Sequence, residues 1–178
     1  MYGADAVPSD ALVMKIVRSP FPHAAFTIGD LDEYQASHPD VRLVLTAHDV
    51  TGINRFGVIP GFIDQPVYAV NETRFHGEAV AGVVFDAESV ATIEDFPVEW
   101  SELPAIESIE EALDASAPAV QEDGLSNILV EGYVERGEVD RALAEAAVVT
   151  SGEFATTFVE HAYIEPEAGW AEMDSDVV

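Results

Sequence analysis

The sequence predicts an α+β fold, and three observations support this prediction. Residues 11–17, 41–46 and 79–85 are short aliphatic runs with the length and composition of buried strands. Suitable N-capping residues begin several of the segments between such runs, which predicts short helices there. Apolar residues make up 48% of the 178 residues, so the chain can bury a core of ordinary size despite a formal net charge of −27.

The first strand, at residues 11–17, stops at the proline-rich stretch RSPFPHA, residues 18–24. Proline has no N–H for a sheet ladder and restricts the residue before it, so the sheet should end there. Residues 25–28 then form a second short strand. We expect Arg18 and His23 to hold this strand end by hydrogen bonds, although the His23 ring could instead reach a ligand.

A short helix is expected after the second strand. Asp30 is a suitable N-cap, Glu33 stands three residues later, and Tyr34 would lie on the inner face of the helix. His38 and the proline after it end the helix before the β-rich strand at residues 41–46.

A second strand–helix–strand unit begins with the buried strand at residues 79–85. Asp86 can cap a helix that runs to about Asp95, and apolar and polar residues then alternate at 96–100, as in a half-buried strand. Two strands joined by a helix form a βαβ unit, which predicts a parallel pair and a right-handed crossover. The first helix and its two flanking strands repeat this plan.

Residues 50–66 form a long loop that is punctuated by glycines and prolines. Its six large apolar side chains are unusual for a solvated connection: Ile53, Phe56, Val58, Ile59, Phe62 and Ile63. A long loop without secondary structure is uncommon in a compact domain and is often functional. The alternative is that the loop simply packs over a sheet edge.

The second half of the chain consists of short predicted elements joined by polar segments. Residues 108–114 form a helix with Ser and Glu in capping-box spacing, and residues 115–127 form an acidic linker. A further helix is expected at 138–147, with Leu143 among its inward side chains, and a strand at 148–158.

The charge distribution excludes several classes of partner. From Asp86 onward lie 24 of the 34 acids but only two of the seven bases. A surface this acidic repels phosphate groups. We therefore expect neither nucleic acid nor an anionic membrane as a partner. Cysteine is absent, which excludes disulfides and thiolate metal sites within the chain. No run reaches the roughly 20 apolar residues of a membrane span, and no basic signal region opens the chain, so we expect a cytoplasmic location.

Two pairs of residues have spacings that could suit catalysis or metal binding. His161 and Glu165 have a spacing that suits a metal or acid/base site, but structural polar contacts are the simpler interpretation. His76 and Glu78 could form an acid/base pair, or could belong to a capped turn. The motifs GxSxG, GxGxxG, HExxH and GxxxxGK[ST] are all absent, so we expect no catalytic residue and no metal ligand in this chain.

Several stretches, taken in order, resemble the molybdenum-binding large subunit of the xanthine dehydrogenase and aldehyde oxidase family, also called molybdenum hydroxylases. They are YGADA (2–6), RSPFPHA (18–24), VLTAHDVTGIN (44–54), QPVYAV (65–70), RFHGEAVAGVV (74–84), VEWSELPAI (98–106), EEAL (110–113) and EHAYIEPEAGWA (160–171). No single stretch is diagnostic. Their order and spacing over nearly the whole chain make the resemblance specific.

The resemblance implies an α/β hammerhead domain at residues 1–105, a helix and acidic linker at 106–127, and the start of the molybdopterin-binding domain at 128–178. Members of this family oxidise aldehydes or N-heterocycles with water as the oxygen source and a molybdenum–pterin cofactor. Iron–sulfur clusters and FAD, on partner domains or subunits, then take the electrons. The implied partners are therefore the remainder of the molybdenum subunit and those redox partners.

The resemblance also suggests roles for particular residues. Phe56, Ile59, Phe62 and Gln65, on the long loop, are candidates for the wall of the substrate channel. The family's catalytic residues and most of its cofactor contacts would lie beyond residue 178, so this portion alone should not turn over substrate. An alternative is a non-catalytic interaction or assembly module with a hammerhead fold. We also expect exposed apolar surface, and self-association through it, around four aromatic residues: Phe154, Phe158, Tyr163 and Trp170.

Overall fold

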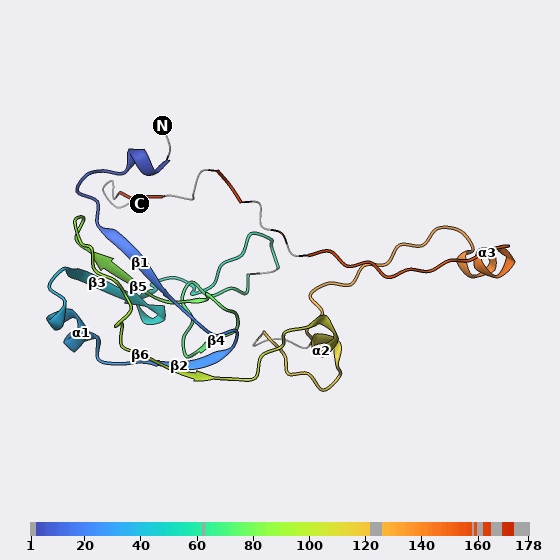
Figure 1. The fold of residues 1–178 in the computed structure, drawn as a ribbon, viewed down its shortest axis with the longest axis horizontal. Coiled ribbons are helices and arrows are strands. Elements are labelled where there is room, and N and C mark those ends of the chain that lie inside the picture. The colour runs from blue at the N-terminus through green and yellow to red at the C-terminus, as the bar shows by residue number, and fades with distance from the viewer. Residues whose placement is uncertain are drawn as a thin grey trace.

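The computed structural model describes residues 3–61, 63–121, 126–157, 159, 162–164 and 169–172. Over these residues the strands are β1 (Val13–Arg18), β2 (Ala24–Ile28), β3 (Val41–Thr46), β4 (Glu72–Thr73), β5 (Ala79–Phe85) and β6 (Val98–Glu102). The helices are α1 (Leu31–Ser37), α2 (Ile109–Leu113) and α3 (Val139–Glu145), with short 3-10 turns η1 (Gly3–Ala6) and η2 (Ala47–Asp49). The strands gather at one end of the molecule, and α3 lies at the far end of a long arm (Figure 1).

The first sheet has the order β1–β5–β3, with β5 in the centre. Both neighbours run antiparallel to β5, so that Ala81 lies opposite Val17 on one side and Thr46 on the other. Val80, Val83 and Phe85 are fully buried. A strand with neighbours on both sides and cover on both faces needs a nearly continuous apolar sequence, which is what β5 has.

The second sheet has the order β4–β2–β6 and is also antiparallel. β6 pairs with β2 along its whole length, from Ala24 opposite Glu102 to Ile28 opposite Val98. Near the middle of this pairing the rings of Phe26 and Trp100 lie 5.5 Å apart. Aromatic cross-strand pairs of this kind stabilise an antiparallel sheet.

The prediction of parallel strand pairs is wrong. Each expected unit contributes one strand to each sheet: β2 and β6 belong to the second sheet, whereas β3 and β5 belong to the first. α1 therefore connects two sheets instead of crossing back over one. Hydrophobic periodicity identifies the strands correctly, but it contains no information about which strands pair.

The prediction of a helix from Asp86 to Asp95 is also wrong, because the chain forms turns there instead. Asp86 accepts two hydrogen bonds from the Arg42 guanidinium, at 2.6 and 2.9 Å, and its carbonyl accepts the Ser89 N–H at 3.0 Å. The Lys15 ammonium also donates to a carbonyl in this segment. Such tertiary contacts outweigh the weak helix propensity of a segment rich in β-branched residues.

Two of the expected helix starts are confirmed. The Asp30 carboxylate accepts the backbone N–H groups of Asp32 and Glu33, each at 3.0 Å, and so caps α1. Tyr34 on α1 is buried, with its ring 5.4 Å from that of Phe96. A reciprocal capping box likewise opens α2.

The arm, residues 128–157, has no interior. Every residue in it is exposed, and α3 stands at its tip (Figure 1). The expected inward face of α3 is wrong, since Leu143 is exposed. The prediction of a strand at 148–158 is wrong for residues 148–157, because these residues form no strand. Phe158 lies outside the described residues. Among the described residues, no helix has the length and apolar character needed to cross a bilayer.

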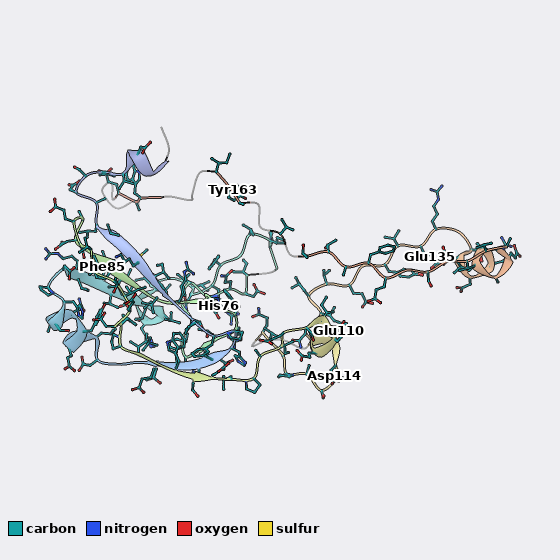
Figure 2. The ribbon with its side chains drawn as sticks, in the orientation of Figure 1. His76, Phe85, Glu110, Asp114, Glu135 and Tyr163 are labelled. Carbon is teal, nitrogen blue, oxygen red and sulfur yellow. The ribbon has the colours of Figure 1, made fainter. Side chains whose placement is uncertain are left out.

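Replacing Phe85 by alanine tests the central strand. The Phe85 side chain, labelled in Figure 2, is 0% exposed, so its loss leaves a cavity and should lower the free energy of unfolding by about 3–5 kcal/mol. The matched control is Phe154→Ala on the arm, where the ring is 94% exposed and the change should stay within about 0.5 kcal/mol. Urea unfolding followed by circular dichroism measures both. Equal effects of the two substitutions would contradict the assignment of the core.

Candidate functional site

The long loop begins at a fixed turn after β3. Thr46 and Asp49 form a reciprocal capping box around η2, in which the Thr46 N–H donates to Asp49 Oδ2 at 2.8 Å. This hydrogen bond, joined by one from the Thr46 hydroxyl, holds the pKa of Asp49 below its ordinary value of 3.8. The direction in which the chain enters the loop is therefore set by side-chain chemistry.

Two clamps close the base of the loop. Phe56 and Gln65 form an isolated antiparallel bridge, with N–H to carbonyl distances of 2.7 and 3.3 Å. Beside it, the Asn54 amide donates to the Tyr68 carbonyl at 2.8 Å and accepts the Tyr68 N–H at 3.1 Å. The Asn54 side chain thus makes the two bonds that a neighbouring strand would make.

Tyr68 joins the loop to the central strand. Its hydroxyl lies against Gly82 of β5, where a Cβ atom would stand only 2.5 Å from the Tyr68 hydroxyl oxygen. Glycine at this position therefore permits the close approach of the ring. The consequence is a continuous path of contacts from β5 through Tyr68 to Asn54.

The loop tip presents apolar side chains to solvent. Val58 is 100% exposed, and Phe56 and Ile59 are also exposed. The chain reverses at Gly61, whose φ of +93° suits glycine. Of the four channel-wall candidates, the structure brings Phe56 and Gln65 together. Ile59 lies in the part of the loop between these two residues, which we call the lobe. Phe62 lies outside the described residues.

Hollows border the base of the loop. One, of about 240 Å³, has the polar side chains of Asn54, Asp64 and Arg74 among those in its wall. Another, of about 490 Å³, lies between Asp64 and α2 and is more apolar, with Ile109 in its wall. An apolar lobe beside hollows with a few polar groups is the kind of surface that binds small organic molecules.

His76 and Glu78, candidates for an acid/base pair, occupy structural positions. Glu78 is buried, its carboxylate accepts the Arg74 N–H at 2.6 Å, and burial raises its pKa. His76 is exposed, and the Glu78 N–H donates to the Phe75 carbonyl at 3.2 Å, so these residues form the expected capped turn. His161 and Glu165 lie outside the described residues. Within the described ranges, no three histidine or acidic side chains come together in a way that could hold a metal ion.

The strand end at RSPFPHA is held as the sequence predicts. The Arg18 guanidinium donates to the Gly77 carbonyl at 2.8 Å. His23 Nδ1 lies 2.6 Å from the Pro104 carbonyl oxygen, and its Nε2 lies 3.1 Å from Glu72 Oε1. The ring therefore contacts protein groups on both sides.

Replacing Asn54 by alanine should loosen the loop base without disturbing the core. Two hydrogen bonds are lost, so trypsin cleavage after the exposed Arg55 should accelerate roughly 5- to 30-fold. Cleavage after Arg136, on the arm, serves as an internal reference and should not change. Asn71→Ala, at an exposed asparagine outside the clamp, is the control. Unaltered cleavage after Arg55 in Asn54→Ala would show that the clamp does not hold the loop.

Two family descriptions match consecutive parts of the chain. Residues 1–104 match "Aldehyde oxidase and xanthine dehydrogenase, a/b hammerhead domain". Residues 120–177 match "Molybdopterin cofactor-binding domain".

Similar proteins are considerably longer than this chain. The nicotinate dehydrogenase large molybdopterin subunit of Eubacterium barkeri is 31% identical over 98% of this chain and 40% of its own length. A probable xanthine dehydrogenase subunit of Bacillus subtilis is 33% identical over 98% of this chain and 23% of its own length. The chain thus spans less than half the length of either relative.

Solved structures agree with the sequence relationships. Quinoline 2-oxidoreductase from Pseudomonas putida 86 superimposes with a TM-score of 0.66 and 35% identity, over 82% of this chain and 19% of that one. The aldehyde oxidoreductase from Desulfovibrio gigas gives a TM-score of 0.60 and 28% identity, over 69% of this chain and 15% of that one. The chain belongs to the aldehyde oxidase and xanthine dehydrogenase family, and its two sheets form the α/β hammerhead domain of that family.

Proposed function

We propose that this chain is the N-terminal portion of the molybdenum subunit of a hydroxylase or dehydrogenase. The complete enzyme would oxidise aldehydes or N-heterocycles and take the oxygen atom from water. One observation carries the proposal: the two family matches follow one another, at 1–104 and 120–177, in a chain that spans less than half of its relatives.

The division of the chain is part of this proposal. Residues 1–105 form the hammerhead domain, 106–127 a helix and acidic linker, and 128–178 the start of the molybdopterin-binding domain. The distribution of buried residues supports the division, because all described residues of the hydrophobic core precede residue 105. From Ile128 to Thr157 no residue is shielded from solvent.

The arm carries apolar side chains that an independent domain would bury. Its exposed apolar residues include Leu129, Val130, Tyr133, Val134, Leu143, Val148, Val149 and Phe154. Tyr163 and Trp170, beyond the arm, are exposed as well, as expected from the sequence, and Phe158 is outside the described residues. Large exposed apolar surfaces usually belong to interfaces. We infer that the remainder of the subunit covers the arm, and that self-association replaces this contact when the remainder is missing.

The residues of the arm do not fit a molybdenum–pterin cofactor by themselves. A segment in which every residue is exposed encloses no space, and the acidic side chains of the arm would repel the phosphate of a pterin. The cofactor contacts and the catalytic base are therefore assigned to the remainder of the subunit. Iron–sulfur and FAD domains or subunits would accept the electrons.

The long loop is assigned to the substrate channel. Phe56, Ile59 and Phe62 would form its apolar wall, and Gln65 would add an amide. The observations in favour are the exposed apolar side chains of the lobe and the two clamps at its base. Such a wall suits flat, weakly polar substrates, whose burial depends mostly on apolar contact.

Co-expression with the remainder of the subunit tests the proposed function. The assembled protein should contain molybdenum and pterin, and should transfer oxygen from ¹⁸O-labelled water to an aldehyde or an N-heterocycle. The 178-residue chain alone should contain neither cofactor and show no turnover. Capture of the chain by an unrelated client, with no molybdenum in any complex, would instead favour an assembly module.

Ile59→Ala tests the channel wall in the assembled enzyme. Loss of an apolar contact to the substrate should raise KM about tenfold while kcat changes little. The matched control is Leu12→Ala, just before β1, since the two side chains are similarly exposed, at 58% for Ile59 and 54% for Leu12, and Leu12 lies outside the loop and the hollows at its base. Steady-state kinetics with the best substrate measure both variants. An unchanged KM in Ile59→Ala would remove this residue from the channel.

A further inference from the structure

Strand β6 has a histidine contact at each end. It is an edge strand of five residues that, within the part of the chain that the structure describes, pairs with β2 alone. Just before it, His38 of the α1 C-terminus contacts Asp95, and just after it, His23 at the start of β2 contacts Pro104. These contacts join positions that are 57 and 81 residues apart in the sequence.

The contacts of His23 need both of its ring nitrogens to carry a proton. Nδ1 lies 2.6 Å from the Pro104 carbonyl oxygen, and Nε2 lies 3.1 Å from Glu72 Oε1. Both oxygens are acceptors, whereas a neutral imidazole has a single N–H. The two hydrogen bonds can therefore exist together only in the protonated ring.

His38 has the same arrangement. Its Nδ1 lies 2.8 Å from the Tyr34 carbonyl oxygen, and its Nε2 lies 2.8 Å from Asp95 Oδ2. The Ser37 hydroxyl, 3.1 Å from Nδ1, also lies within donating distance of the Glu33 and Tyr34 carbonyls, so it need not supply a proton to the ring. Again only the doubly protonated imidazolium can make both contacts.

We propose that the protonated rings of His23 and His38 latch the two ends of β6 to the hammerhead domain, and that loss of these protons loosens the strand. A neutral ring would keep one hydrogen bond and face the other acceptor with a lone pair. The strand would then open from its ends.

On balance, the groups around each ring raise its pKa. The Pro104 carbonyl, and after it Glu72, raise the pKa of His23 above its ordinary value of 6.5, although Arg74 opposes them. The Tyr34 carbonyl, followed by Asp95 and Asp40, raises the pKa of His38 above 6.5. Because the folded pKa values exceed the unfolded ones, the stabilisation is complete below pH 6.5 and is lost as the pH rises through the folded values.

Trp100 provides a local probe of β6. Its ring packs on Phe26 at 5.5 Å and on Phe21 at 6.3 Å, so loosening of the strand should expose it to water. Trp170→Phe in the full 178-residue chain leaves Trp100 as the single tryptophan. Its emission is recorded from about pH 6 to pH 9, while NMR follows the proton signals of the histidine rings.

Both rings should titrate above pH 6.5, and the Trp100 emission should shift to longer wavelength over the same range. The double variant His23→Gln and His38→Gln should lose this pH response, because glutamine stays neutral, while His76→Gln should retain it. An emission that stays constant while both rings titrate would overturn the proposal. So would a response that survives in the double variant.

A second pair of variants keeps the test independent of folding defects. Glu72→Gln leaves His23 in place but removes the facing charge, so the titration midpoint of His23 and the associated part of the Trp100 response should move to lower pH. Glu102→Gln, at an exposed carboxylate at the end of β6, should leave the His23 midpoint nearly unchanged. Equal shifts in both variants would indicate general charge repulsion and contradict a specific latch.

Discussion

The pairing of β5 with both β1 and β3 is the interaction on which the rest of the structure depends. It buries Val80, Val83 and Phe85 completely and so supplies much of the apolar contact in the hammerhead domain. Gly82, in the same strand, lets Tyr68 approach closely, and Tyr68 in turn holds Asn54 at the base of the long loop. The position of the exposed lobe is therefore a consequence of the core, since no contact of the lobe's tip is needed to place it.

The second half of the chain, in contrast, has no core of its own to position it. The arm carries large apolar side chains but lacks a sheet or helix on which to bury them, so local propensity can form α3 but no strand. This contrast between a domain with its own core and an arm without one fits a chain that matches a hammerhead domain at 1–104 and a molybdopterin cofactor-binding domain at 120–177, and that covers only part of its relatives. The edge strand β6 is the last strand before the linker, so the contacts of His23 and His38 hold the end of the hammerhead domain next to the linker.

Local features, such as caps and buried strands, were predictable from the sequence. Most contacts between residues distant in the sequence were not. The Asp30 cap and the buried strand at 79–85 follow from residue type and periodicity, and both are confirmed. The prediction of a helix after Asp86 was wrong because Arg42 and Lys15, both distant in sequence, determine the backbone there. The candidate site shows the same division. Its apolar loop residues were visible in the sequence, but the Asn54–Tyr68 clamp was not, because nothing in a lone asparagine indicates which backbone it will bind.

Hydrogen–deuterium exchange tests the dependence of the arm most directly, by comparing the chain alone with the chain bound to the remainder of its subunit. We expect strong protection of β5 in both states, because the hammerhead domain has its own core. We expect rapid exchange over residues 128–157 in the chain alone, kept dilute enough to be monomeric, and protection of this arm only in the assembled subunit. A protected arm in the monomer, or an arm that exchanges rapidly in both states, would contradict this dependence.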